Sequence, residues 1–147
     1  MIIGIIIVLI FVGLGTWFLV NKFILKKNSK TTPKGMSFMC DTELDESYLK
    51  LLDSHYDWAV GRGMVMEPKN ITLTIIECPQ GSQGNYRYEM KGSPTGYAAG
   101  EVDCMNPVLI KMCRQTPEVL KHEFKHVILF QKNGDPNNAH TDPIWAE

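Results

Sequence analysis

The chain has 147 residues and is close to neutral, with 15 Lys and Arg against 16 Asp and Glu. All 16 acidic residues lie after position 35 together with only 10 of the basic ones, so residues 36–147 carry a net charge near −6 and the segment before them is basic. An acidic domain is a poor candidate for binding nucleic acid, because neutralising phosphates requires clustered Lys and Arg. We therefore expect no nucleic-acid partner.

The first 21 residues are predicted to form a transmembrane anchor. Residues 2–20 contain no charge and are rich in Ile, Val, Leu and Phe, which allows a helix to cross a bilayer. A cleaved signal peptide is the alternative, but the basic start and small-residue cleavage site of that class are not clear here. Lysines follow from Lys22 to Lys34, so the positive-inside rule predicts a single-pass membrane protein with its C-terminal domain in the cytoplasm. Residues 22–35 are predicted to be a basic polar linker.

Residues 36–147 are expected to form one compact domain that begins with a helix. This helix is predicted from Asp41 or Thr42 to Val60, because its apolar residues keep helical spacing up to two closely spaced glycines. His55 falls within it and is expected to be a packing or surface residue rather than a ligand.

Three later segments have the alternation or the β-branched content of strands, and a loop rich in Gly, Gln and Ser separates the first from the second. The predicted strands cover residues 71–78, 97–103 and 108–113, and the loop or hairpin covers 79–94. A helix, a small sheet and a final helix in this order predict an α+β domain.

Four cysteines, at positions 40, 78, 104 and 113, include no C-x-x-C pair and so no cysteine pattern for zinc. In a cytoplasmic domain we expect them to be free, buried thiols. In an oxidising compartment they would instead form two disulfides, with three possible pairings.

The most informative motif is H-E-x-x-H at residues 122–126, inside a predicted amphipathic helix over 116–132. His122 and His126 are four residues apart, so they project from one face of the helix and can bind one metal ion. Glu123 reaches the same space, where a catalytic zinc site uses it as general base rather than as ligand. The helix has a Thr-Pro-Glu start and an Asn-Gly stop.

A catalytic zinc site needs a third protein ligand and an open position for water. We predict His140 as this ligand, because the helix stop and Pro136 turn the chain back and imidazole is the commonest zinc ligand. Asp142 and Glu147 are the alternatives.

These residues resemble the zincin metallopeptidases over roughly 115–145. The metzincin pattern is absent, since Leu129 and Lys132 occupy positions where it requires Gly and His. The layout is similar to that of small zincin-like domains of phage and bacteria, in which the motif helix is followed by a Gly-Asp turn, a third His and a Trp, here Gly134-Asp135, His140 and Trp145. The SprT-like zincins are a second possible relation.

The resemblance implies one catalytic zinc ion bound by His122, His126 and His140, with Glu123 as general base. It also implies a helix, a small mixed or antiparallel sheet and the motif helix, with residues 97–104 or a neighbouring segment lining the metal cleft. Tyr97 and His55 are both candidates for stabilising the oxyanion, and neither is favoured.

We therefore expect a membrane-anchored zinc metallopeptidase that hydrolyses peptide bonds of a peptide or protein substrate with a zinc-activated water. The alternative is a zincin-like metal-binding accessory module of a phage or mobile element without peptidase activity. A third possibility is a small membrane protein in which the motif occurs by chance.

Overall fold

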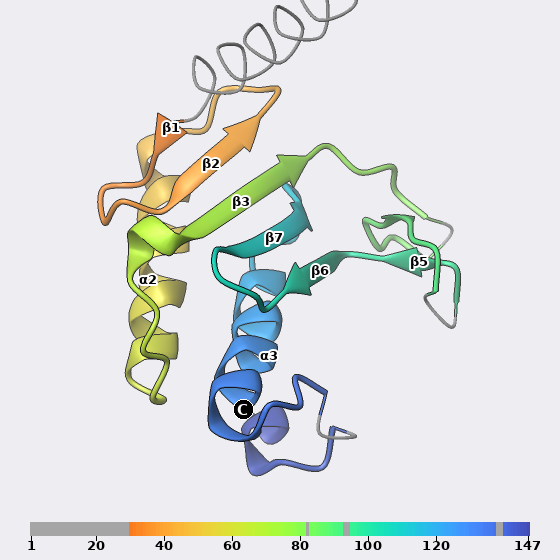
Figure 1. Cartoon of the computed structure of the whole chain (residues 1–147). Helices are drawn as coiled ribbons and strands as arrows, with labels where there is room; N and C mark the ends of the chain where they lie inside the picture. Colours follow the sequence, from red (N-terminus) through yellow and green to blue (C-terminus); the bar gives the residue numbers. More distant parts are fainter. Residues whose placement is uncertain (1–29, 82, 93–94, 138–139) are drawn as a thin grey trace, which may run out of the picture.

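The computed structural model describes residues 30–147 except 82, 93, 94, 138 and 139. Its elements in chain order are β1 (Lys30–Thr31), β2 (Ser37–Cys40), α2 (Glu46–Val60), the 3₁₀ turn η1 (Pro68–Asn70), β3 (Ile71–Ile76), β4 (Tyr88–Glu89), β5 (Tyr97–Ala98), β6 (Gly100–Asp103), β7 (Val108–Cys113), α3 (Val119–Asn133) and the 3₁₀ turn η3 (Pro143–Ala146) (Figure 1). The fold is α+β, as the sequence predicts.

Five strands form one mixed sheet in the order β1-β2-β3-β7-β6. The inner strands β2, β3 and β7 are parallel, and β1 and β6 are antiparallel edge strands. The helix α2 connects β2 to β3, and β4 pairs with β5 in a separate two-stranded ribbon. Along the chain, β7 comes directly after the edge strand β6 and directly before the motif helix α3.

The predicted strands at 71–78 and 108–113 correspond to β3 and β7, whereas the predicted strand at 97–103 is divided into β5 and β6 at Ala99. At Ala99 the chain passes from pairing with β4 to pairing with β7, and the Ala99 carbonyl accepts a hydrogen bond from the Cys113 N–H of β7 (2.9 Å). The strand β2 has no counterpart among the predicted strands, and β1 lies within residues 22–35, which are predicted to be a linker.

The core lies between one face of the sheet and the two helices. Alternate residues of β3 and β7 point into it and lie side by side in parallel register, so that Leu73 is beside Ile110. The helices contribute Leu52 from α2 and Phe124 from α3, both fully buried in the same cluster. The motif helix is thus fixed against the sheet by its apolar face.

Both helices end within one residue of the predicted position, but both start later than predicted. The helix α2 starts at Glu46 because the Asp45 carboxylate accepts the Tyr48 N–H (2.7 Å), which makes Asp45 the cap instead of Asp41 or Thr42. The helix α3 starts at Val119 without a side-chain cap.

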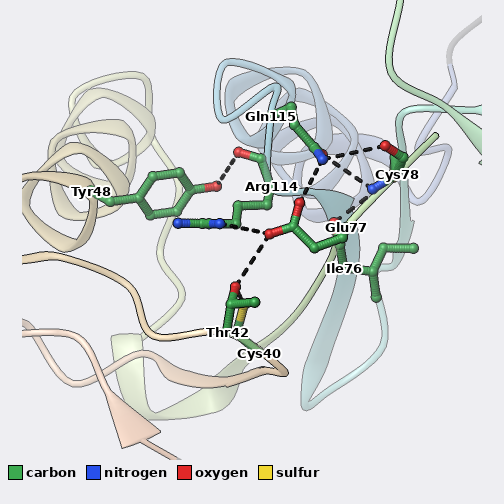
Figure 2. A network of polar contacts seen from close by, with 8 residues as sticks. All are labelled: Cys40, Thr42, Tyr48, Ile76, Glu77, Cys78, Arg114 and Gln115. Carbon is green, nitrogen blue, oxygen red and sulfur yellow. Dashed lines mark hydrogen bonds and ion pairs between the residues drawn. The ribbon is translucent and has the colours of Figure 1, made fainter. Parts of the chain in front are cut away.

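A polar network fixes the segment before α3 to the end of β3 (Figure 2). The Glu77 carboxylate accepts hydrogen bonds from Arg114 Nη1 and Gln115 Nε2, both at 2.6 Å, and from Thr42 Oγ1 at 3.3 Å. Tyr48 of α2 donates its hydroxyl hydrogen to the Arg114 carbonyl (2.9 Å). The network therefore determines where the motif helix leaves the sheet.

Beside this network, Cys78 and Cys113 form a disulfide between the ends of β3 and β7. The prediction of four free thiols is therefore wrong for this pair, because the parallel pairing of β3 with β7 brings the two cysteines together. Cys40 and Cys104 are free.

The predicted membrane anchor needs correction. A helix must be about 20 residues long to span a bilayer core of about 30 Å. The two helices in the described part, α2 and α3, have 15 residues each, and neither is long and apolar enough to cross a membrane. The segment 1–21 itself lies outside the described residues. In the part of the chain that the structure describes, the expected N-terminal transmembrane helix and single-pass membrane localisation therefore find no support.

Candidate metal centre

The two motif histidines lie one turn apart on α3. The buried residues of this helix include Leu120, Phe124 and Val127, which pack on the sheet and on α2. His122 and His126 therefore lie on another side of the helix, with their Nε2 atoms 3.2 Å apart. Two imidazole nitrogens this close repel one another unless a proton or a cation lies between them.

The loop after α3 orients His126. Gly134 adopts a left-handed conformation (φ 76°) and ends the helix, as predicted, and its N–H bonds to the Phe130 carbonyl. The returning chain places the Pro136 carbonyl 2.8 Å from His126 Nδ1. Because this carbonyl can only accept, Nδ1 carries the hydrogen, and Nε2 of the neutral ring keeps its lone pair for a metal.

The same loop brings His140 to the pair. Its ligating nitrogen and those of His122 and His126 all lie within 4.8 Å of one another. The two alternatives for the third ligand have other partners, since the Asp142 carboxylate accepts from Lys132 Nζ (3.0 Å) and Glu147 pairs with Arg62. The structure thus brings together the three histidines that the sequence singles out.

The donor set fits a zinc ion. Zinc–nitrogen bonds of about 2.0–2.1 Å at tetrahedral angles place two ligand nitrogens about 3.4 Å apart, close to the 3.2 Å between His122 and His126. Burial, followed by the nearby His126 and His140, lowers the pKa of His122 to about 4, and burial also lowers the pKa of His126. Both rings are therefore neutral near pH 7, which is the protonation state that binds metal.

Glu123 lies beside the histidines in a cleft of about 280 Å³ between α3 and β6. Its side chain is only 4% exposed, and burial, together with the nearby Glu101, raises its pKa to about 8. A carboxyl group with a pKa near neutrality is suited to accepting and releasing a proton at physiological pH.

The edge strand β6 forms the opposite wall of this cleft, with Gly100, Glu101 and Val102. A Cβ atom at Gly100 would lie 2.5 Å from Glu123 Oε1 and would also overlap Val119 Cγ1. The absence of a side chain here therefore allows β6 to approach α3 closely. These residues fall within the segment 97–104 that is expected to line the cleft.

Trp145 of η3 packs against the whole histidine cluster. Its ring centroid lies 4.2 Å from that of His140, 4.9 Å from His126 and 5.1 Å from His122. In the sequence, Trp145 is noted only as the Trp that follows the third His in zincin-like domains. Its contact with the three histidines depends on how η3 folds back on α3.

The two candidates for stabilising an oxyanion are not in the cleft. Tyr97 is half exposed on β5, and His55 is buried between the helices, 3.6 Å from the Glu118 carboxylate. Neither Gly100 nor the Pro136 carbonyl is singled out by the sequence, because no local pattern tells which backbone groups come to lie beside the motif residues.

Comparison of the chain with protein-family models, with curated proteins and with solved structures found no match. The resemblance to zincins thus depends on the residues of the motif and on their arrangement.

Proposed function

We propose that this protein is a zinc-dependent metallopeptidase in which Glu123 is the general base. The observation that carries the proposal is the convergence of three histidine nitrogens within 4.8 Å of one another next to a buried glutamate in one cleft. A site that only stored metal would need the histidines but would have no use for this glutamate.

His122, His126 and His140 would hold the ion. A bound zinc ion supplies Lewis acidity, which lowers the pKa of water at the site and polarises a substrate carbonyl. The Glu123 carboxylate accepts a proton from water as the water oxygen bonds to the carbonyl carbon. It then delivers that proton to the amide nitrogen as the carbon–nitrogen bond breaks.

The edge strand β6 suits an extended peptide as substrate. It pairs with β7 on one side, and Gly100, Glu101 and Val102 line the cleft that contains Glu123. A peptide that added a further strand to this edge would lie alongside the histidines, with its backbone hydrogen-bonded to β6. Such pairing depends mainly on the peptide backbone.

The test compares the full-length wild type with Glu123→Gln, which replaces the base by an amide of nearly the same shape. We expect about one zinc ion per chain in both proteins and cleavage of a peptide library by the wild type alone. Zinc in both with cleavage by neither would favour the metal-binding accessory module. A wild type that takes up no zinc would exclude the proposed site altogether.

A further inference from the structure

We propose that Trp145 is the positioning residue that holds His140 in the three-histidine cluster. The inference rests on the metal-binding part of the proposed function and adds a role for a residue outside the ligand set. It explains how a ligand from an exposed loop is kept next to two ligands on a rigid helix.

His140 needs such support more than the other two histidines. The helix α3 fixes His122 and His126, and the Pro136 carbonyl also orients His126. His140 is exposed and has a left-handed backbone (φ 54°), a conformation that is uncommon outside glycine. Its ring centroid lies 4.2 Å from that of Trp145, closer than to His126 (5.7 Å) or His122 (6.1 Å). The indole is therefore its main aromatic contact.

Trp145 is itself anchored by contacts that do not involve the histidines. The Asp142 carboxylate caps η3 by accepting the Ile144 N–H (3.0 Å) and also accepts from Lys132 Nζ on α3 (3.0 Å). Ile144 packs on the hydrophobic core, and Glu147 pairs with Arg62 just after α2. Contacts on both sides of Trp145 thus fix η3 to the two helices.

Lys125 connects the indole to the motif helix. This lysine is only 8% exposed, and its Nζ lies 5.9 Å from the ring centroids of both Trp58 and Trp145. An ammonium group within about 6 Å of an aromatic face is attracted to it. Because Lys125 precedes His126 directly, this attraction fixes the indole relative to the helix that carries two of the ligands.

The indole N–H shows how Trp145 is held. Its Nε1 is buried and has no hydrogen-bond partner among the described residues. The ring is therefore held by packing and by Lys125 rather than by a hydrogen bond, so phenylalanine should replace much of its effect. An aliphatic side chain of similar burial lacks the flat face that contacts the imidazoles.

The experiment measures zinc affinity of the full-length protein by competition with a chromogenic chelator, with Co²⁺ absorption spectra as a report on ligand number. Trp145→Ala and Trp145→Leu are expected to weaken zinc binding about 10- to 100-fold, as loss of an outer contact to a metal ligand usually does. Trp145→Phe is expected to stay within about fivefold of wild type, because a planar ring is kept. Trp58→Phe is the control, since it changes a second indole that faces Lys125 but keeps an aromatic ring for Arg62, and it should change affinity less than about threefold.

Wild-type affinity in Trp145→Leu would overturn the inference, and so would an equal loss in the Phe and Leu variants. If Trp145→Ala does not fold, the Phe and Leu pair still decides, because both keep apolar bulk under η3. A wild type that binds no zinc overturns this inference together with the proposed function. Zinc binding that depends on Trp145 without any cleavage overturns only the peptidase.

Discussion

Replacing Gly100 by alanine tests whether the contact between β6 and α3 controls the position of Glu123. The added Cβ would lie 2.5 Å from Glu123 Oε1, about 0.9 Å inside the 3.4 Å at which ordinary contact begins, and would overlap Val119 Cγ1 as well. Val119 is β-branched, so its χ1 angle is restricted and moving Cγ1 away from the added atom has a cost. Either β6 moves away from α3 or the Glu123 carboxylate is displaced.

Overpacking of this kind typically costs about 1–3 kcal/mol, so we expect Gly100→Ala to unfold about 4–12 °C below the wild type. Zinc affinity should stay close to wild type, because no ligand contacts Gly100, while peptide cleavage should fall sharply. The assays are thermal unfolding, chelator competition and cleavage of a fixed peptide.

The double variant Gly100→Ala with Val119→Ala separates the two overlaps. Removing the Val119 methyl groups should make the pair more stable than the sum of the single effects by about 1 kcal/mol. Cleavage should remain low, because the overlap with Glu123 persists. Strictly additive stabilities would show that the overlap with Val119 does not matter. A Gly100→Ala variant with normal stability and cleavage would show that the close approach of β6 to Glu123 does not matter.

Two further predictions concern ionisation and the disulfide. In metal-free protein the pKa of Glu123 is raised to about 8, so at neutral pH the folded state keeps a proton that the unfolded state has lost. The free energy of unfolding therefore falls by about 2 kcal/mol as pH rises from 6.5 to 8. The lowered pKa of His122 acts in the opposite direction at lower pH, between about 4 and 6.5. Urea unfolding with a chelator present should show this decline in the wild type, and a similar decline in Glu123→Gln would assign it to another group. Thiol labelling of the unfolded, unreduced protein should modify only Cys40 and Cys104. The Cys78–Cys113 bond closes a loop of 35 residues, so breaking it should lower the free energy of unfolding by about 3–4 kcal/mol. Labelling of all four cysteines without reductant would contradict the pairing.

The sequence predicts those parts of the fold that depend on local spacing. The two helices and the strands β3 and β7 follow from periodicity, because each buries one regular face. It does not predict β2, whose four residues are extended mainly because they pair with β3. It also misplaces the start of α2, since Asp41 and Asp45 are equally able to cap and only the tertiary structure selects between them.

The residues of the candidate site also fall into two groups, those that local sequence predicts and those that it does not. His122, Glu123 and His126 can be placed from the sequence because one helix fixes their relation. The loop that returns His140 also follows from local signals, the glycine stop and the proline after it. Gly100 and Trp145 act across the fold, and their roles become visible only when β6 and η3 are placed against α3.

The strand β7 is preceded in the chain by β6 and followed by α3, so both walls of the cleft belong to one continuous stretch from Gly100 to Asn133. His140 and Trp145 follow within a short distance. The metal centre is therefore built from neighbouring segments, whereas β2 and β3 pair across the intervening helix α2. A protein with this topology would acquire its metal-binding geometry as a unit, and insertions between β4 and β5 would not separate the three histidines.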